Sequence, residues 1–376
     1  MKPINVLFVA EGQLGDLLLL TPALRAMKES FPSASITVLI VERRSNDREW
    51  LPNEVLWQVH DQSATVLSTN PSIHQLFRLN RTLLTSKHGI ARLRAEVEVI
   101  RFLRKQEFDM VVCTFPEDRF ALWAFASGAH VRIGEREQGL SWLLTHRPEI
   151  RKRDRGVLQY YCDLVRTAGA QIESDRTEYV VPDSSKQWAD DFLQGHGLEA
   201  ATRLVVVHPG ATGNYKIWPA ERFASLIDTL QSDTKASVVL CHGSHDIPIV
   251  ERIRDKLKTS AVQADTGSNI GHLAAILKRS ALCISNDSGP RHLAVAVGTP
   301  SLALFRQFHE REWGVYEGGS NCTILQGGDP CPSCPIGACL DRIPEGEAFG
   351  SFCLRMVTVE HAFLQAMKML DFPKNK

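Results

Sequence analysis

Short apolar runs alternate with segments of helical periodicity along most of the chain. An apolar run over residues 6–10 ends in a glycine-containing turn, after which apolar residues recur at helical spacing from Leu17. This pattern predicts a strand, a loop and a helix. The helix is expected to stop before Phe31-Pro32, because proline disfavours helical geometry in the residue before it. Later segments predict strands over residues 36–41, 108–113 and 131–134, with a helix between 85 and 105.

The second half of the chain repeats this opening. Apolar residues 204–208 lead into another glycine-containing loop, and a helix is predicted from Pro219 to Leu230 because proline fits the first helical turn. Strands are then expected over residues 237–241, 281–285 and 300–305, separated by helices over 247–257, 270–278 and 291–297. The alternation predicts an α/β protein with two doubly wound, Rossmann-like sheets.

The length supports two domains, since 376 residues is more than one hydrophobic core usually fills. A polar stretch over residues 181–203 is the expected linker region. We expect domains over residues 1–180 and 181–357, followed by a C-terminal helix over residues 358–376 that Thr358 caps. Two facing sheets would leave a central cleft at the carboxyl ends of their strands, where α/β proteins usually bind ligands.

Composition narrows the class of partner. Lys plus Arg equals Asp plus Glu at 43 each, which argues against nucleic acid as the main ligand. The N-terminal apolar run is too short for a secretory signal, and no run approaches the roughly 18 apolar residues of a membrane span. These features predict a cytoplasmic protein with at most peripheral contact with a membrane.

A loop of small and polar residues follows the strand predicted over residues 281–285. It reads Asn286-Asp287-Ser288-Gly289-Pro290-Arg291-His292. The backbone N–H groups of such a loop and of the following helix suit a diphosphate, to which Ser288 and His292 can donate hydrogen bonds. Asp287 is acidic, so we expect it to hold loop N–H groups or a sugar hydroxyl. The alternative is an ordinary strand-to-helix turn, which favours the same residue types.

A second candidate loop begins with His208-Pro209-Gly210 and carries Lys216 shortly before the predicted helix. A lysine at this position could neutralise a leaving diphosphate. The alternative is an ordinary solvated loop lysine. Because the loop lacks the residue order of a P-loop, hydrolysis of nucleoside triphosphates is not supported.

The third candidate is the first glycine-containing loop, in which Asp16 directly follows Gly15. Its glycines do not form the dinucleotide-binding fingerprint, which argues against a dehydrogenase. Asp16 could act as a general base toward an attacking hydroxyl. The alternative is that Asp16 caps the helix that follows.

Taken in order, the three loops resemble glycosyltransferase family 9, the bacterial lipopolysaccharide heptosyltransferases. The resemblance runs through most of the chain. Its motifs are Gly15-Asp16 with Thr21-Pro22-Ala23-Leu24, then His208-Pro209-Gly210 with Lys216 and Trp218-Pro219-Ala220-Glu221-Arg222-Phe223, and finally Asn286-Asp287-Ser288-Gly289-Pro290 with His292-Leu293-Ala294 and Gly298-Thr299-Pro300.

The resemblance implies a GT-B fold in which the N-terminal domain binds the acceptor and the C-terminal domain binds ADP-L-glycero-β-D-manno-heptose. It implies inverting transfer to a lipopolysaccharide core or related glycan, with Asp16 as general base and no cofactor required for catalysis. Lys216 would meet the diphosphate or the sugar. The residues implied in donor binding are Gly15, Thr212, Lys216, Asp287, Ser288, Gly289 and His292. A sugar-nucleotide epimerase and a noncatalytic nucleotide-sugar binding protein stay open as alternatives.

Two positions depart from the family pattern. Ala10 stands where many relatives have a basic residue at the end of the first strand, which leaves the acceptor's identity open. Gly243-Ser244-His245-Asp246 stands where they have a glutamate, so Asp246 is only a possible substitute toward ribose and base.

Basic residues gather in two segments of the first half. The first comprises Arg78, Arg81, Lys87, Arg92, Arg94, Arg101, Arg104 and Lys105, and the second Arg147, Arg151, Lys152, Arg153 and Arg155. They are expected to meet an anionic glycolipid at the inner face of the inner membrane. The alternative is an ordinary solvated surface.

Four of the nine cysteines lie close together near the C-terminus, namely Cys331, Cys334, Cys339 and Cys353. The leading Cys-x-x-Cys predicts a structural zinc or iron site that staples a loop, with reduced surface thiols as the alternative. Most of the other five cysteines are expected to be small buried apolar residues.

Overall fold

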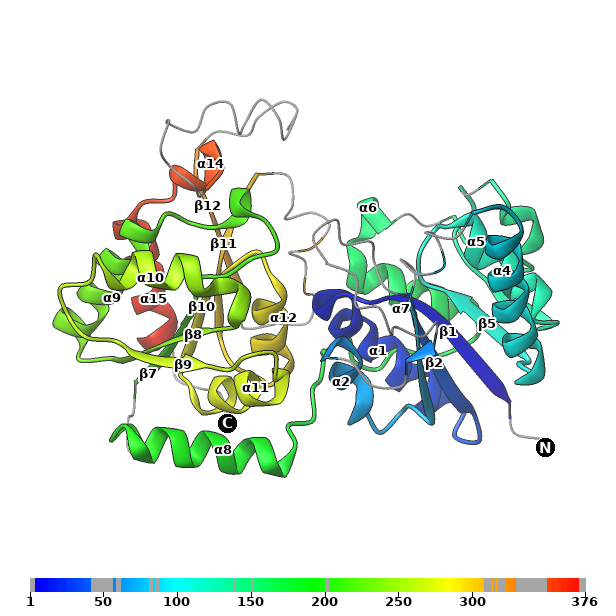
Figure 1. Cartoon of the computed structure of the whole chain (residues 1–376), viewed down its shortest axis with the longest axis horizontal. Coiled ribbons are helices and arrows are strands. Elements are labelled where there is room, and N and C mark those ends of the chain that lie inside the picture. The colour runs from blue at the N-terminus through cyan, green and yellow to red at the C-terminus, as the bar shows by residue number, and fades with distance from the viewer. Residues whose placement is uncertain are drawn as a thin grey trace. The chain divides into compact units, whose positions relative to one another are not determined.

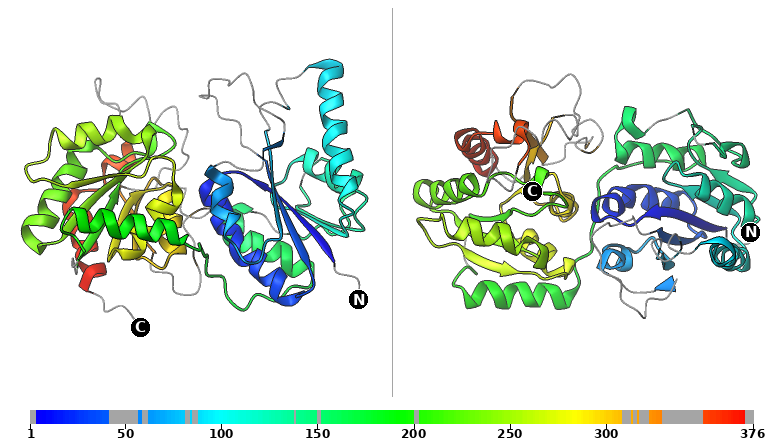
Figure 2. Two further views of the ribbon diagram at one scale, coloured as in Figure 1. Left: turned by 60° about the horizontal axis from the view of Figure 1, so that its bottom comes forward. Right: turned by 45° about the horizontal axis from the view of Figure 1, so that its top comes forward.

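The chain folds into two compact units, Met1–Thr177 and Glu178–Lys376, in the computed structural model (Figure 1). The structure describes residues 4–41, 57–58, 62–80, 84, 88–137, 139–149, 152–199, 203–307, 313, 316, 322–328 and 350–371. In this part of the chain each unit contains one six-stranded sheet. Figure 2 shows helices on both sides of each sheet. The predicted α/β class with two parallel sheets is therefore confirmed.

The sheet of the first unit has the strand order β3-β4-β2-β1-β5-β6. Its strands are β1 (Asn5–Glu11), β2 (Ser35–Val41), β3 (Trp57–Gln58), β4 (Gln75–Leu79), β5 (Met110–Cys113) and β6 (Val131–Ile133). All neighbours pair in parallel except β3 with β4. β1, β2 and β5 are buried along almost their whole length, as expected for parallel strands covered by helices on both faces.

The helices of the first unit include both of those that the pattern predicted. They are α1 (Leu14–Ser30), α2 (Gln62–Ser68), α4 (Gly89–Lys105), α5 (Asp118–Ala126), α6 (Lys152–Arg155) and α7 (Val157–Thr167), with a short 3-10 turn η1 (Ser141–Leu143). α1 ends at Ser30, where Phe31-Pro32 predicted the stop. α1 also packs against α7, the helix nearest the C-terminal end of the unit. This packing brings Tyr161 of α7 to Asp16 of α1.

The sheet of the second unit is parallel throughout, in the order β12-β11-β10-β7-β8-β9. Its strands are β7 (Leu204–His208), β8 (Ser237–His242), β9 (Val262–Asp265), β10 (Leu282–Asn286), β11 (Ser301–Phe305) and β12 (Cys322–Gln326). Its helices are α8 (Asp183–Gly195), α9 (Ala220–Thr234), α10 (Ile247–Arg254), α11 (Ile270–Arg279), α12 (Gly289–Ala296), α14 (Phe352–Arg355) and α15 (Val359–Asp371).

Helix boundaries in this unit follow local chemistry. Pro219 occupies the N-cap of α9, so the helix begins one residue later than predicted. α12 begins at Gly289, two residues earlier than predicted, because Pro290 fits the first helical turn. Thr358 caps α15 as expected, since its hydroxyl accepts a hydrogen bond from the His361 N–H at 3.1 Å.

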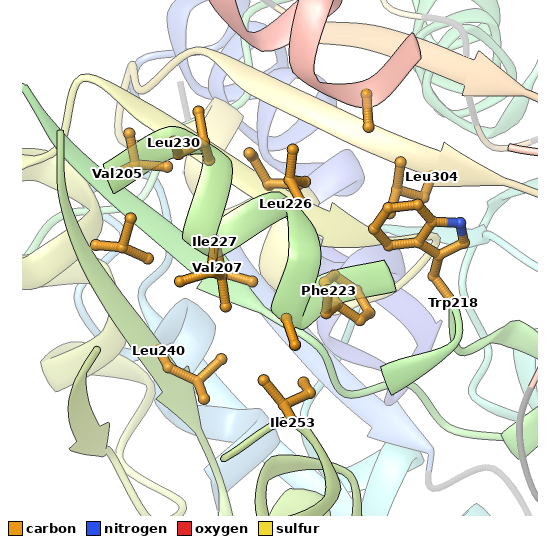
Figure 3. Close-up of a cluster of buried hydrophobic side chains, with 14 of the residues drawn as sticks. Val205, Val207, Trp218, Phe223, Leu226, Ile227, Leu230, Leu240, Ile253 and Leu304 are labelled. Atoms are coloured by element: carbon orange, nitrogen blue, oxygen red, sulfur yellow. The ribbon is translucent and has the colours of Figure 1, made fainter. Parts of the chain in front are cut away.

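The core of the second unit forms between α9 and the sheet. Trp218 and Phe223 are fully buried, with ring centroids 5.1 Å apart in an edge-to-face arrangement. Leu226 and Ile227 of α9 pack with β7 side chains such as Val207 (Figure 3). This core holds the loop after β7, which contains Lys216, firmly against the sheet.

Within the described residues, no helix has both the length and the apolar character that crossing a bilayer requires.

Candidate active site

The loop between β10 and α12 lies at the carboxyl end of a fully buried strand. The Asp287 N–H donates to the Leu304 carbonyl at 3.1 Å, which extends the ladder between β10 and β11 by one residue. Ser288 then occupies the N-cap of α12, and its hydroxyl donates to the Asn286 carbonyl at 3.4 Å. The first-turn N–H groups of α12, beginning with Gly289, thus lie beside the end of the strand, where such groups can bind an anion.

Asp287 bridges two cations in this loop. Its side chain is 7% exposed, with Oδ2 3.5 Å from Lys216 Nζ and Oδ1 3.7 Å from a guanidinium nitrogen of Arg291. Its carboxylate therefore pairs with side-chain cations from the loop after β7 and from α12. The structure brings Lys216 and Asp287 together, although they lie 71 residues apart.

Asn286 joins the two glycine-containing loops of the second unit. Its buried amide accepts a hydrogen bond from the Trp218 N–H at 3.0 Å and donates one to the Pro209 carbonyl at 2.6 Å. Lys216 lies in a 3-10 turn, η2 (Asn214–Lys216), between these two anchor points. Thr212 is exposed in the same loop. Asn286 thereby fixes the path of the segment that carries Lys216.

Arg291, in the first turn of α12, is a fully buried cation next to the loop between β10 and α12. Its guanidinium carbon lies 4.8 Å from the ring centroid of Phe305 and 5.6 Å from that of Tyr316. One nitrogen donates to the Trp313 carbonyl at 2.9 Å. A buried charge is stable only with such partners, so these contacts and Asp287 hold Arg291 in place.

His292 is a neutral, buried part of this support. Arg291 donates to His292 Nε2 at 2.8 Å, and because a guanidinium cannot accept, Nε2 must be the acceptor. In the neutral ring Nδ1 then carries the proton and donates to the Tyr316 hydroxyl at 2.5 Å. Burial, followed by the charge of Arg291, lowers the pKa of His292 well below its usual value. Both ring nitrogens are engaged, whereas we had expected His292 to donate to the ligand.

The start of the loop after β7 explains the glycine of His208-Pro209-Gly210. A Cβ on Gly210 would lie 1.9 Å from Asp246 Oδ1, so a larger residue there would have to displace the Asp246 carboxylate. Asp246 Oδ2 accepts from the Gly243 N–H at 2.9 Å and lies 3.7 Å from His208 Nε2. Burial lowers the pKa of His208, and Asp246 opposes this effect. Asp246 therefore ties the ends of β7 and β8 together.

Asp16 lies in the first unit, as the third residue of α1 with 3% of its surface exposed. The N-cap of α1 is Gln13, so the alternative interpretation of Asp16 as the cap is wrong. The Tyr161 hydroxyl of α7 donates to Asp16 Oδ1 at 3.3 Å. Burial, and then the charge of Asp16, raise the pKa of Tyr161 well above its usual value, which keeps the hydroxyl protonated. Gly15 precedes Asp16 in the same turn and is half-buried.

A family model described as glycosyltransferase family 9 (heptosyltransferase) matches residues 97–334. The chain belongs to this family. It is accordingly a glycosyltransferase, which favours the transferase over the epimerase and the noncatalytic binding protein that the sequence left open.

Individual members of the family are similar to this chain over most of their length. The chain is 25% identical over 297 residues to lipopolysaccharide heptosyltransferase 3 of Escherichia coli, covering 77% of this chain and 80% of the relative. Its fold is similar to that of a glycosyltransferase family 9 protein from Veillonella parvula DSM 2008, with a TM-score of 0.79, 22% identity and 98% coverage of both chains. The Escherichia coli heptosyltransferase WaaC, solved with ADP, gives a TM-score of 0.68 at 17% identity, covering 97% of this chain and 100% of that one.

These structural neighbours confirm the expected GT-B fold class for this glycosyltransferase. The central cleft between its two domains stays a prediction.

Three supporting residues of this glycosyltransferase were not found from the sequence. Tyr161 lies 145 residues from Asp16, and no local pattern connects them. Asn286 and Arg291 belong to the loop motif that follows β10, but their residue types alone did not show which groups they would contact. The one available signal for Arg291 was a charged residue in a short helix that is apolar from Leu293 to Ala296.

The basic segments agree only in part with the surface that we expected. Arg78 is 5% exposed within β4 and therefore does not belong to the surface, which corrects the prediction. Five of the other members are exposed along α4, namely Arg92, Arg94, Arg101, Arg104 and Lys105. Arg81, Lys87 and Arg151 lie outside the described residues, as do the side chains of Lys152 and Arg153. Arg147 is exposed, and Arg155 pairs with Asp163 at 3.1 Å.

Three members of the cysteine cluster, Cys331, Cys334 and Cys339, lie outside the described residues. Cys353 is buried at the start of α14, with its Sγ 3.5 Å from the Ser351 hydroxyl. Over the described ranges, no group of three or more His, Cys, Asp or Glu residues could hold a metal ion. Four of the scattered cysteines are buried as predicted, namely Cys113, Cys162, Cys241 and Cys283.

Proposed function

We propose that this glycosyltransferase transfers heptose from ADP-L-glycero-β-D-manno-heptose to a lipopolysaccharide core or related glycan, with inversion at the anomeric carbon. The observation that carries the proposal is the ion pair between Lys216 and Asp287 beside the N-terminus of α12. The relative solved with ADP supports the choice of nucleotide. The similarity to lipopolysaccharide heptosyltransferase 3 supports the choice of sugar and acceptor.

The donor side has the charges that a leaving diphosphate requires. The Lys216 side chain is 21% exposed, so its ammonium can reach a ligand while Asp287 holds it in position. An ammonium has three N–H donors, which leaves some for phosphate oxygens after the contact with Asp287. The α12 N-terminus, with Ser288 and Gly289, adds backbone donors and a positive dipole. These groups can stabilise the developing negative charge without a metal ion.

Other residues complete the donor side of the proposal. We assign Gly15 to donor binding by its place in the family motif, and Thr212 by its place in the loop that carries Lys216. His292 belongs to the same loop, and its hydrogen bonds to Arg291 and Tyr316 support it as a positioning residue.

The acceptor side supplies the base. In the proposed step the acceptor hydroxyl oxygen attacks the anomeric carbon, the bond from that carbon to the diphosphate oxygen breaks, and ADP leaves. The hydroxyl proton passes to the Asp16 carboxylate. The hydrogen bond from Tyr161 orients this carboxylate and stabilises its ionised form.

Replacing Asp16 tests the assignment of the base. Asp16→Asn should lower kcat for transfer from ADP-heptose by about 1,000-fold, because the amide cannot accept the proton. Binding of ADP, measured by calorimetry, should stay at the wild-type value.

Thermal unfolding with ADP, UDP or GDP identifies the nucleotide in the same protein preparation, and ADP should stabilise the wild type most.

Glu29→Gln is the matched control, because Glu29 is an exposed carboxylate at the other end of α1. It should leave both transfer and ADP binding unchanged. Full activity in Asp16→Asn would refute the general base. Stabilisation by UDP alone would refute the donor.

The acceptor and the site of action follow from the proposed reaction. We assign the acceptor to an anionic glycolipid at the cytoplasmic face of the inner membrane, with no role for nucleic acid. The exposed arginines of α4 provide complementary positive charge.

We also propose that Cys331, Cys334, Cys339 and Cys353 hold a structural zinc or iron ion. Four thiolates would close the coordination sphere, so the metal would brace a loop and take no part in transfer. Metal analysis of the purified, reduced protein should find one equivalent of zinc or iron, and Cys334→Ser should lower it. Protein that carries no bound metal would rule the site out.

A further inference from the structure

The first two turns of α4 stand apart from the rest of that helix. Every residue from His88 to Arg94 is exposed, and burial begins only at Ala95. Within this segment, which we call the α4 tip, the side chain of Ile90 is 71% exposed and that of Leu93 is 64% exposed. Among the described residues of the first unit, only Trp142, at 68%, is a large apolar residue with comparable exposure.

The remainder of α4 behaves as an ordinary surface helix. Ala95, Val99 and Leu103 recur at helical spacing and form its buried stripe. Most helical stability in proteins comes from packing of such a stripe, and the α4 tip has none. Two large aliphatic side chains in a helical segment that contacts no core indicate a surface that is covered by a partner.

The charge of the α4 tip identifies the class of partner. Arg92 and Arg94 are exposed within it, and its sequence His-Gly-Ile-Ala-Arg-Leu-Arg contains no acidic residue. The nearest carboxylate on the helix, Glu96, pairs with Arg119 at 3.1 Å and accepts from the Trp123 indole at 3.1 Å. A helix segment with exposed aliphatic residues, exposed arginines and no acidic residue is typical of helices that lie in the interface of an anionic bilayer.

The position of the α4 tip fits the same partner. The end of α4 leads into β5, where the Asp109 N–H donates to the Asn5 carbonyl at the amino edge of the sheet. The helix therefore runs back toward the carboxyl edge, and the Glu96–Arg119 pair lies at the level where α5 begins. The α4 tip extends beyond that level, past the edge of the sheet at which Asp16 follows β1 (Figure 2).

We propose that the α4 tip docks on an anionic lipid bilayer, with Ile90 and Leu93 at the boundary between headgroups and acyl chains. Arg92 and Arg94 then contact the anionic headgroups. The choice of a bilayer rests on the proposed function, in which the acceptor is lipid-linked. Docking by this edge brings the first unit to the surface that holds the acceptor.

Vesicle flotation tests the docking without any sugar donor. The wild type should float with vesicles of phosphatidylethanolamine and phosphatidylglycerol, and not with vesicles of phosphatidylethanolamine and phosphatidylcholine. Arg92→Gln/Arg94→Gln should weaken binding to the anionic vesicles by about 30-fold, and Ile90→Ser/Leu93→Ser by a similar factor. Added salt should weaken the wild type, because screening shortens the reach of the arginines.

Leu364→Ser is the matched control, since Leu364 is 49% exposed on α15 in the other unit. It should float as the wild type does. Transfer to a water-soluble oligosaccharide acceptor should be unchanged in Ile90→Ser/Leu93→Ser, which separates this test from that of the proposed function. Wild-type protein that ignores anionic vesicles, or double variants that float normally, would overturn the proposal. A lipid-independent dimer that Ile90→Ser/Leu93→Ser dissociates would overturn it too, by identifying a second copy as the partner.

Discussion

At the residue scale, the candidate site residues are polar groups that contact partners far away in the sequence. Asp16 and Tyr161 lie 145 residues apart, and Lys216 and Asp287 lie 71 apart. Buried polar atoms without partners are costly, so each of these contacts stabilises the fold as well as orienting a group for chemistry. Asp16 is the clearest case, because a hydroxyl from a helix near the end of its unit donates a hydrogen bond to its carboxylate.

Tyr161→Phe should therefore change the titration of the base. A hydrogen bond donated to a carboxylate stabilises its ionised form, so loss of the hydroxyl should raise the pKa of Asp16. We expect kcat/KM at neutral pH to fall by about 10-fold. The acidic limb of the pH profile should move to higher pH, and binding of ADP should be unchanged.

Tyr160→Phe is the appropriate comparison. Tyr160 is the adjacent residue of α7, it is fully buried, and its ring centroid lies 5.8 Å from that of Tyr161. A general weakening of the unit would affect both variants, whereas a shifted acidic limb should occur only in Tyr161→Phe. An identical pH profile in the two variants would contradict a positioning role for Tyr161.

At the scale of elements, local pattern predicted most strands and helices and missed those whose pattern is ambiguous. β1, β7 and β10 are continuous apolar runs and were predicted nearly to the residue. β4 was missed because Gln75-Leu76-Phe77-Arg78-Leu79 contains an arginine that tertiary packing buries. β9 was missed because it is four residues long and contains Gln263 and Asp265.

Loops show the same division. The glycine of His208-Pro209-Gly210 was visible in the sequence, but its reason is the approach of Asp246 from the end of β8. Likewise, Pro290 marks the start of α12, whereas the contacts of Arg291 with Phe305 and Tyr316 depend on β11 and a later segment. The residue types of a turn follow from local geometry and can be predicted from the sequence. The residues that pack against the turn come from distant segments and cannot.

At the scale of the whole molecule, the two units divide the proposed chemistry between acceptor and donor. The donor unit carries His208 and His292, both buried and both with a lowered pKa. In the unfolded chain each would titrate near its ordinary value of about 6.5. Below that pH the unfolded chain binds more protons than the folded one, so stability is full above it and falls as the pH falls.

Acidification should therefore destabilise the protein before its carboxylates titrate. Each of the two histidines should remove up to about 1.4 kcal/mol of unfolding free energy per pH unit below its unfolded pKa. Denaturant titrations over a series of pH values measure this slope. His208→Gln should make the slope shallower, whereas His361→Gln should not, because His361 is exposed on α15. Equal slopes in wild type and His208→Gln would contradict the assignment.

The sequence by itself determined most of the succession of strands and helices, the α/β class with two sheets and the positions of the three loops to which we assign the chemistry. These depend on periodicity, proline and glycine, whose effects act within a few residues. Tertiary structure alone decided that Tyr161 contacts Asp16, that Asp287 bridges Lys216 and Arg291, and that His292 is neutral and fully hydrogen-bonded. It also separated the buried Arg78 from the exposed arginines of the α4 tip. Such pairings depend on burial and on contacts between distant segments, which leave no periodic trace in the chain.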